Sequence, residues 1–321
     1  MQRSRILSTG PIERISLDIL KPFGEITVAP DNSEAALVQS LEAVVGLIVR
    51  GSVTISSRVI EAGADLKVIA RSGVGYDTVD IDAATARGLP VVFTPGAGAR
   101  AVAEGAMAMM LSLCKRISYW DDQLKAGNWE SRFQGGTGDL EGGVLGIVGF
   151  GRIGQILAQL AVPFEMEVLA FDPYVAEKTA GALDVELVEL NELLARASFI
   201  SLHAAATHET RGMISRARLR RVRRGAFLIN MARGELVESL DVLYEALEER
   251  RLGGVGLDVF SPEPPDVSHP IFRSPNCITS PHALGMSARA TERIFTSMAQ
   301  DMAAIFRGDR PRFVVNPEVL S

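Results

Sequence analysis

The sequence predicts an α/β protein built from two units, each a parallel sheet covered by helices. A glycine-rich turn at 149–154 separates an apolar run from a helical pattern, and short apolar runs alternate with helical patterns on both sides of it. Such alternation is typical of parallel sheets with helical crossovers. A last helical pattern, 288–306, follows the second unit. We therefore expect the chain to return to the first unit, which would be discontinuous.

The glycine-rich turn has G-x-G-x-x-G spacing at Gly149, Gly151 and Gly154. In such a turn the first glycine makes the bend, the second lets the backbone approach a pyrophosphate, and the third lets helix and strand pack closely. The helix that follows offers free N–H groups to the phosphates. The next apolar run ends in Asp172, where an acid would accept ribose hydroxyls. The turn therefore predicts a dinucleotide site.

The other expected elements follow the same rhythm. Strands are expected at 5–8, 25–28, 46–49, 66–70 and 91–93, with helices at 33–43 and 80–87. A helix at 101–117 precedes an irregular linker or arm at 119–142. Later helices are expected at 185–194, 216–223 and 236–250, later strands at 198–202, 226–231, 254–257 and 277–279, and an extended tail at 313–320.

Composition limits the kinds of partner. The 321 residues carry a net charge of −6 with a pI near 5.4, so nucleic acid is not expected to bind. The one dense basic run, 216–224, is expected to be a solvated helix face. Cys114 and Cys277 lie in apolar segments, and both are expected to be core residues in a reducing compartment.

Membrane and metal signals are weak. The N-terminus lacks the apolar region of a signal peptide, and the longest apolar stretch, 106–114, is too short to span a bilayer. No pair of histidine and cysteine has metal-ligand spacing. We expect a cytoplasmic protein without a membrane partner or a bound metal.

Four polar residues follow expected strands of the second unit: His203, Arg233, Asp258 and His282. The carboxyl ends of parallel strands meet at one edge, where a dinucleotide binds, so these side chains are expected at one site. Hydride transfer between a nicotinamide and a carbonyl needs a proton donor and a cation that polarises the C=O. Imidazoles ordinarily titrate near neutral pH, so His282 is the best donor.

A catalytic histidine must be held in one tautomer, which a neighbouring carboxylate does. Glu263, in a proline-rich loop, is the candidate. Arg233 would hold a substrate carboxylate bidentately while its charge draws on the carbonyl. In the first unit, Arg50 and the segment 71–75 also follow strands, and two glycines flanking one residue can turn backbone N–H groups towards an anion.

Seven short segments match one enzyme family, in order along nearly the whole chain. The chain resembles the D-isomer-specific 2-hydroxyacid dehydrogenases, most closely the phosphoglycerate dehydrogenase branch. The segments are L-I-V-R (47–50), A-R-S-G-V-G-Y-D (70–77), G-F-G-R-I-G (149–154), F-D-P-Y (171–174), N-M-A-R-G-E-L-V (230–237), G-L-D-V-F-S-P-E-P-P (256–265) and S-P-H-A-L-G (280–285).

The resemblance implies two Rossmann/flavodoxin-like domains with parallel sheets. A discontinuous substrate-binding domain would cover 1–99 and 288–321. An inserted NAD-binding domain would cover 100–287 and join a homodimer. The implied activity is an NAD-dependent oxidoreductase acting on the CH–OH group of a small D-2-hydroxy acid, most closely a 3-phosphoglycerate type.

The resemblance also assigns residues. The catalytic triad falls on Arg233, Glu263 and His282. The NAD contacts fall on Gly149, Gly151, Arg152, Ile153, Gly154, Asp172, Pro173, His203, Thr210, Met231, Ala232, Arg233, Asp258, His282 and Gly285. The substrate contacts fall on Arg50, Arg71, Ser72, Gly73, Val74, Gly75, Arg233 and His282.

Three departures from the family pattern stand out. Gly105 replaces the usual histidine or leucine, so the start of the helix at 101–117 is expected to pack differently. Alanines at 204–206 replace a proline-and-leucine segment, which weakens the assignment of the adenine side. With the chain ending at Ser321, serine feedback through an appended regulatory domain is not expected.

The sequence leaves alternatives open for the substrate and for the class of function. Asp172 favours NAD over NADP, because a carboxylate repels a 2′-phosphate. A glyoxylate/hydroxypyruvate reductase is the alternative among enzymes, and an NAD-sensing protein like the C-terminal-binding corepressors is the alternative from another class. Formate dehydrogenases pair their histidine with a glutamine, so Glu263 argues against that activity. Phosphoglycerate, glycerate or glyoxylate, and sulfolactate all remain open as substrates.

Overall fold

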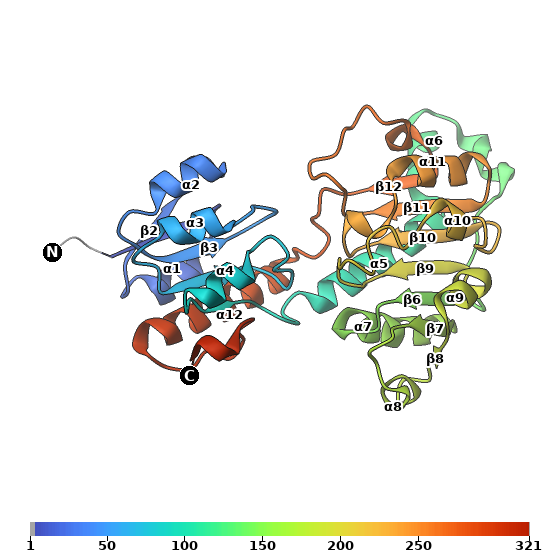
Figure 1. Ribbon diagram of the computed structural model, residues 1–321. Coiled ribbons are helices and arrows are strands. Elements are labelled where there is room, and N and C mark those ends of the chain that lie inside the picture. Colours follow the sequence, from blue (N-terminus) through green and yellow to red (C-terminus); the bar gives the residue numbers. More distant parts are fainter. Residues whose placement is uncertain (1–3, 321) are drawn as a thin grey trace. The chain divides into compact units, whose positions relative to one another are not determined.

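The computed structural model describes residues 4–320, which divide into two compact units (Figure 1). Unit 1 contains the residues up to Gly98 and those from Met286 onwards. Unit 2 is the continuous stretch Ala99–Gly285. The last long helix belongs to unit 1, so this unit is discontinuous.

Within the described residues, unit 1 is built on a parallel five-stranded sheet in the order β2-β1-β3-β4-β5, a flavodoxin-like order. Its strands are β1 (Arg5–Ser8), β2 (Glu25–Val28), β3 (Val44–Val49), β4 (Val68–Arg71) and β5 (Val91–Val92). Its helices are α1 (Arg14–Leu20), α2 (Glu34–Ser40), α3 (Ser57–Ala62), α4 (Ile81–Ala86), α12 (Ala288–Arg307) and the 3-10 turn η5 (Pro317–Leu320). Helices α1 and α12 cover one face, and α2, α3 and α4 cover the other (Figure 1).

Helix α12 explains why the chain returns to unit 1. The Ser287 hydroxyl caps its first turn by accepting a hydrogen bond from the Ala290 N–H, and Gly308 ends it with φ +79°. Its apolar stripe includes Phe295, Met298 and Met302, all buried against the sheet of unit 1. Each such side chain contributes about 1.5–3 kcal/mol when buried, so this face holds the helix firmly on unit 1.

Unit 2 is built on a parallel seven-stranded sheet in the order β8-β7-β6-β9-β10-β11-β12, counted over the described chain. This is the Rossmann order 3-2-1-4-5-6 with a seventh strand added. Helices α5 and α7 cover one face, and α9, α10 and α11 cover the other (Figure 1). The strands are β6 (Val144–Val148), β7 (Glu167–Phe171), β8 (Glu186–Leu187), β9 (Phe199–Leu202), β10 (Ala226–Asn230), β11 (Leu252–Leu257) and β12 (Cys277–Thr279).

The helices of unit 2 are α5 (Ala99–Cys114), α6 (Ile117–Lys125), α7 (Arg152–Ala161), α8 (Glu177–Gly181), α9 (Leu190–Arg196), α10 (Arg216–Leu219) and α11 (Leu240–Glu248). The 3-10 turns are η1 (Trp129–Gln134), η2 (Val162–Phe164), η3 (Gly234–Leu236) and η4 (Pro270–Arg273).

The segment 119–142 is not irregular throughout, and this expectation was wrong. It contains most of α6 and all of η1. Arg116, with φ 52°, separates α5 from α6, and its guanidinium lies 4.0 Å from the centre of the Tyr119 ring. Five of the nine residues of helix α6 are polar and none of the nine is buried, so no core-facing stripe marks this helix.

Four other expected elements also need correction. The stretch 185–194 is not one helix, because β8 occupies its start and α9 begins only at Leu190. A two-residue strand is too short to show alternation. Helices α10 and α11 are shorter than expected, and the extended tail ends in η5.

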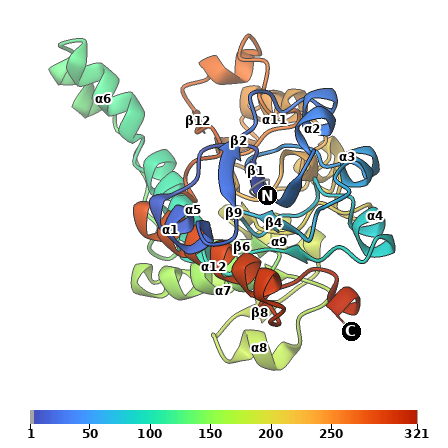
Figure 2. The same ribbon diagram turned by 90° about the vertical axis from the view of Figure 1, so that its left-hand side faces the viewer.

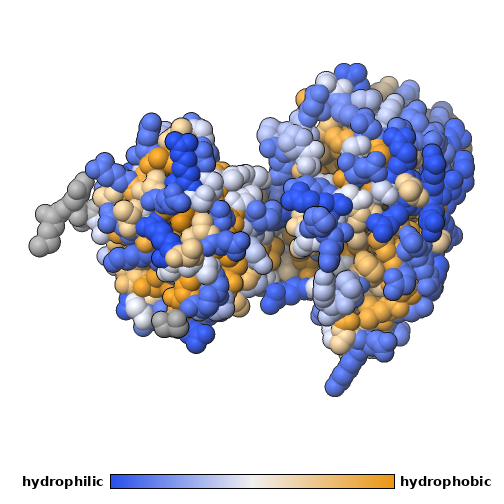
Figure 3. Space-filling model, in the orientation of Figure 1, coloured by the Kyte–Doolittle hydropathy of each residue, from blue (hydrophilic) through white to orange (hydrophobic). Residues whose placement is uncertain are grey.

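No helix within residues 4–320 combines the length and the apolarity needed to cross a bilayer. Figure 3 shows hydrophilic side chains over most of the visible face of each unit, with smaller apolar areas between them. Cys114 is buried and Cys277 half-buried, and both are free thiols. Burial raises the pKa of the Cys277 thiol to about 12, so it stays protonated near neutrality.

Candidate active site

One edge of the seven-stranded sheet carries the strand ends at which the site was expected. The strand register aligns Phe171, Val148, Leu202, Asn230, Leu257 and Thr279 in one row across the sheet. The residues that follow this row are Asp172, Gly149, His203, Met231, Asp258 and Ser280. The polar residues expected at strand ends are therefore neighbours along one edge, where α/β sheets bind ligands.

The three glycines of the β6–α7 turn each meet a different requirement. A Cβ on Gly149, which has φ +94°, would lie 2.5 Å from the Ala204 amide nitrogen, and one on Gly154 would lie 2.5 Å from the Gly149 oxygen. Gly151 instead faces open space, with no described atom within 4 Å of such a Cβ. A side chain there would fill the approach to the N-terminus of α7, so the turn fits a pyrophosphate. Arg152 and Ile153 form the first turn of this helix.

Asp172 is attached directly to the glycine turn. Its Oδ2 accepts a hydrogen bond from the Phe150 N–H at 2.8 Å, and its Oδ1 accepts one from the Tyr174 N–H at 3.0 Å. These two bonds fix the carboxylate beside the turn. Pro173 lies between Asp172 and Tyr174 in the chain. The geometry fits an acid that accepts the hydroxyls of an adenosine ribose.

We expect kcat/KM with NADH to exceed that with NADPH by at least about tenfold. Two like charges about 4 Å apart repel by roughly 1–4 kcal/mol, and 1.4 kcal/mol is a factor of ten. Replacing Asp172 with serine removes the charge and should bring the ratio towards one. Steady-state rates with both cofactors measure this, and equal rates in the unaltered protein would contradict the role given to Asp172.

His203 lies beneath the glycine turn as a neutral, enclosed ring. The backbone N–H of His203 donates to the Val148 oxygen at 2.7 Å. The ring Nε2 lies 2.8 Å from the Ser201 hydroxyl, and the ring Nδ1 is shielded, with no hydrogen-bond partner among the described residues. Burial lowers the pKa of His203 to about 3, so the ring brings no charge to a phosphate. It supports the turn by packing.

Thr210 closes the alanine segment that departs from the family pattern. Its hydroxyl donates to the Ala205 oxygen at 2.6 Å and accepts from the Thr207 N–H at 2.8 Å. These hydrogen bonds of Thr210 hold the loop after β9, which lacks the rigid proline of the family pattern.

The side chains of His282 and Glu263, which were expected to form an acid–base pair, lie within hydrogen-bond distance of each other. His282 Nδ1 lies 3.0 and 3.1 Å from the two carboxylate oxygens of Glu263, which also accepts from the Phe260 N–H at 3.2 Å. The carboxylate side chain is mostly covered at 22% exposure, whereas the imidazole is 45% exposed. With Nδ1 engaged, Nε2 is the nitrogen that can serve a substrate.

Asp258 fixes the backbone that carries His282. Its carboxylate is 3% exposed, and its Oδ1 accepts hydrogen bonds from the Ser280 hydroxyl at 2.6 Å and from the N–H groups of Ala283 and Leu284 at 2.9 and 3.3 Å. Its backbone oxygen accepts from the His282 N–H at 2.8 Å. These bonds hold His282 at φ 53°, a left-handed conformation uncommon outside glycine.

Arg233 lies on the loop after β10, against the loop that carries Glu263. A Cβ on Gly234 would come within 2.1 Å of the Phe260 carbonyl carbon, so only glycine permits this approach. One guanidinium nitrogen of Arg233 donates to the Ala232 oxygen at 2.8 Å. The side chains of Met231 and Ala232 are buried. All three expected catalytic residues thus sit on adjoining loops of unit 2.

Gly105 of helix α5 packs against both catalytic loops. A Cβ there would lie 2.8 Å from Leu284 Cβ, two residues after His282, and 2.9 Å from the terminal methyl of Met231, two residues before Arg233. A Cβ on Gly285 would likewise lie 2.9 Å from a methyl of Val102. The departure at 105 therefore brings the helix closer to the loops than a histidine or leucine would allow.

Unit 1 holds Arg50 at its own topological switch point, between β1 and β3, where open α/β sheets bind ligands. Its N–H donates to the Thr9 hydroxyl at 2.8 Å. Its guanidinium donates to the Pro11 oxygen and lies 5.1 Å from the centre of the Phe295 ring. These contacts orient the guanidinium at the carboxyl edge of the sheet.

The loop Ser72–Gly75 is braced from within unit 1. Arg71 Nε donates to the Gly75 oxygen at 2.8 Å and its Nη1 to the Val49 oxygen at 3.2 Å, while Gly73 takes φ +152°. Val74, at the tip, is 49% exposed. Arg71 therefore supports the loop, and Arg50 is the better candidate of the two for an anionic substituent.

Asn230, Ser280 and Gly234 have no role predicted from the sequence, although all three lie in segments that match the family. The signal was available, because asparagine and serine at strand ends often bond nearby backbone groups. A glycine beside a catalytic arginine likewise suggests a close backbone approach. These three residues hold the loops rather than the reactants.

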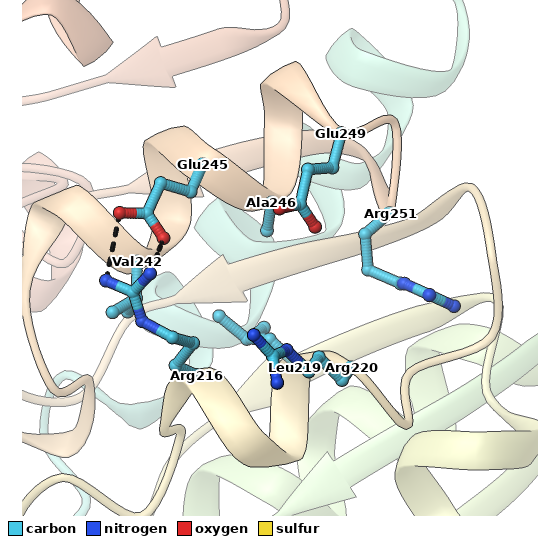
Figure 4. A pocket seen from close by; sticks show the side chains of 8 residues that line it. All are labelled: Arg216, Leu219, Arg220, Val242, Glu245, Ala246, Glu249 and Arg251. Atoms are coloured by element: carbon cyan, nitrogen blue, oxygen red, sulfur yellow. Dashed lines mark hydrogen bonds and ion pairs between the residues drawn. The ribbon is translucent and has the colours of Figure 1, made fainter.

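A shallow groove between α10 and α11 is a separate feature (Figure 4). Arg216 pairs there with Glu245 at 2.9 Å. The remaining lining residues are Leu219, Arg220, Val242, Ala246, Glu249 and Arg251. They come from the two helices and the turn before β11, not from the loops of the candidate site.

Comparison with known proteins gives three findings. Residues 107–283 match the family model for the D-isomer specific 2-hydroxyacid dehydrogenase, NAD binding domain. The chain is 37% identical over 97% of its length to D-3-phosphoglycerate dehydrogenase of Methanocaldococcus jannaschii but spans only 59% of that protein. It is 35% identical to hydroxypyruvate reductase of Thermotoga maritima, over 92% of this chain and 95% of that one.

Among solved structures, D-lactate dehydrogenase of Aquifex aeolicus complexed with NAD and lactic acid matches with a TM-score of 0.88. The two chains are 27% identical, and the match covers 98% of this chain and 99% of the other.

Proposed function

The chain belongs to the D-isomer specific 2-hydroxyacid dehydrogenases, a family of NAD-dependent oxidoreductases, and on that premise we propose that it interconverts a D-2-hydroxy acid and a 2-keto acid. The observation that carries the proposal is the hydrogen-bonded pair of His282 and Glu263. The Glu263 loop lies against the Arg233 loop, at the same sheet edge as the glycine turn.

Each residue has a defined task in this proposal. When bound, NADH supplies the hydride. Arg233 binds the carboxylate of the keto acid and draws electron density from its carbonyl. His282 donates a proton from Nε2 to the carbonyl oxygen, and in the reverse direction accepts it. Glu263 accepts from Nδ1–H throughout, which holds the tautomer and stabilises the imidazolium.

For the substrate we propose a 3-phosphoglycerate type of acid. The D-3-phosphoglycerate dehydrogenase relative supports this choice, as does the cationic Arg50 at the switch point of unit 1. A hydroxypyruvate or glyoxylate reductase is the second candidate. The hydroxypyruvate reductase relative, 35% identical, supports this candidate, and so does Arg71, which donates its hydrogen bonds to its own loop.

Reduction of four acids by NADH separates these possibilities: 3-phosphohydroxypyruvate, hydroxypyruvate, glyoxylate and sulfopyruvate. We expect the highest kcat/KM with 3-phosphohydroxypyruvate, because a guanidinium binds a phosphate strongly. A higher value for hydroxypyruvate or glyoxylate would select the second candidate. NADH binding without turnover of any acid would favour an NAD-sensing protein instead.

We also propose a homodimer formed through unit 2. Helix α6 extends away from the sheet of its unit (Figure 2). It and η1 expose large apolar side chains, with Leu124 60%, Trp129 61% and Phe133 74% exposed. Such a surface favours association with a second copy. Light scattering should give twice the chain mass, and a monomer at micromolar concentration would contradict the proposal.

A further inference from the structure

We propose that Asn230 is a positioning residue for Arg233, and that it affects the reaction through that guanidinium alone. The inference rests on the proposed function, in which Arg233 binds the carboxylate of the substrate. Asn230 itself ends β10 and lies between β9 and β11, with Leu202 and Leu257 as its register partners.

The side-chain amide of Asn230 bonds the backbone of the residues that lead to Arg233. Its Oδ1 accepts from the Ala232 N–H at 3.0 Å, and its Nδ2 donates to the Arg233 oxygen at 2.8 Å. The residue is 1% exposed, so water does not compete for these bonds. One amide thus fixes the peptide units on both sides of the Ala232–Arg233 bond.

The other end of the same segment is fixed by contact. Gly234 lies so close to the backbone of Phe260 that a Cβ would not fit between them. The backbone oxygen of Asn230 accepts a hydrogen bond from the Asp258 N–H at 3.1 Å. The short segment 231–233 is therefore held at both ends. Since rates fall steeply when a reacting group moves by about 1 Å, freeing one end should act on catalysis first.

Asparagine is the side chain that meets both requirements. Aspartate has the same shape and can still accept from the Ala232 N–H, but it offers an oxygen instead of a donor to the Arg233 oxygen. Two acceptors facing each other repel, so the loop must move away. Asn230→Asp is therefore a nearly isosteric change that removes the hydrogen bond to the Arg233 oxygen and keeps the one from the Ala232 N–H.

The chain supplies a matched control in Asn316. This asparagine is also 1% exposed, its Oδ1 accepts from the Val91 N–H at 2.9 Å, and its Nδ2 donates to the Leu89 oxygen at 3.0 Å. It belongs to unit 1 and bonds no residue of the Arg233 loop. Asn316→Asp should lower Tm as Asn230→Asp does while leaving kcat unchanged.

The experiment is a double-mutant cycle between Asn230→Asp and Arg233→Ala in the full chain with NADH. Asn230→Asp alone should lower kcat for the preferred keto acid about 10- to 100-fold. In the Arg233→Ala background the same change should lower kcat less than about twofold, because the group it positions is gone. An equal loss in both backgrounds, or an equal loss from Asn316→Asp, would overturn the proposal.

The affinity of the protein–NADH complex for oxalate, measured by NADH fluorescence, tests the position of Arg233 without turnover. Asn230→Asp should weaken it about tenfold, and unchanged affinity would refute the proposal. If the wild-type protein reduced none of the keto acids, the proposed function would fail, while this arm would still decide on Asn230. Asn230→Ser, which is too short to reach the Arg233 oxygen, carries the same expectations should the aspartate variant not fold.

Discussion

Replacing His282 with asparagine or alanine is expected to lower kcat by about two to four orders of magnitude. That range is typical for the loss of a general acid–base group. Asparagine is the cleaner substitution, because His282 has φ 53° and asparagine tolerates the left-handed region better than alanine does. Steady-state reduction of the preferred keto acid measures kcat, and NADH titration shows whether cofactor binding is retained.

His269 provides the comparison for His282. It also lies close to a carboxylate, with Nε2 3.1 Å from Asp241, but its ring caps η4 instead of following a strand. His269→Ala should leave kcat within about twofold of the wild-type value, since it lies outside the candidate site. Near-normal turnover in the His282 variants would exclude the proposed proton donor.

Replacing Arg233 with alanine is expected to lower kcat/KM for the keto acid by about 10²- to 10³-fold. Two effects combine, because the guanidinium both binds the carboxylate and stabilises the charge that develops on the carbonyl oxygen. Arg233→Lys should recover only part of the loss, since an ammonium keeps the charge but not the bidentate geometry.

Arg218 is the matched arginine for this test, because it too donates to a backbone oxygen of its own unit, that of Met213 at 2.8 Å. Arg218→Ala should leave kcat/KM nearly unchanged. If Arg233→Ala kept more than about a fifth of the wild-type kcat/KM, a carboxylate-binding role would be untenable, because that loss is below 1 kcal/mol.

The parts of the fold that were predicted are those in which residue identity fixes backbone geometry. The glycine turn and the apolar runs before strand-end polar residues determine a parallel sheet and its ligand-binding edge, and both sheets are present. Helix α6 was not predicted because it buries none of its residues, so no core-facing stripe marks it in the sequence. The strand β8 was not predicted from the sequence, because two residues are too few to show a periodic pattern.

The sequence indicated which side chains could form the candidate site, but not the hydrogen bonds that hold those side chains in place. His282 and Glu263 were paired from residue type, from the proline-rich loop around Glu263 and from the family resemblance, and the structure joins the two side chains by hydrogen bonds. The bond from the Phe150 N–H to Asp172 and the use of Arg71 donors within its own loop depend on tertiary positions. Propensity and spacing carry no information about which backbone group a side chain will meet.

The close packing at Gly105 has an evolutionary consequence. Any side chain at 105 competes for space with Leu284 and Met231, so it can be accommodated only if one of those residues shrinks or if both loops retreat. Among homologous sequences, positions 105, 231 and 284 should accordingly vary as a set. Grafting a bulkier residue onto α5 from a relative would then require compensating exchanges on both loops at once.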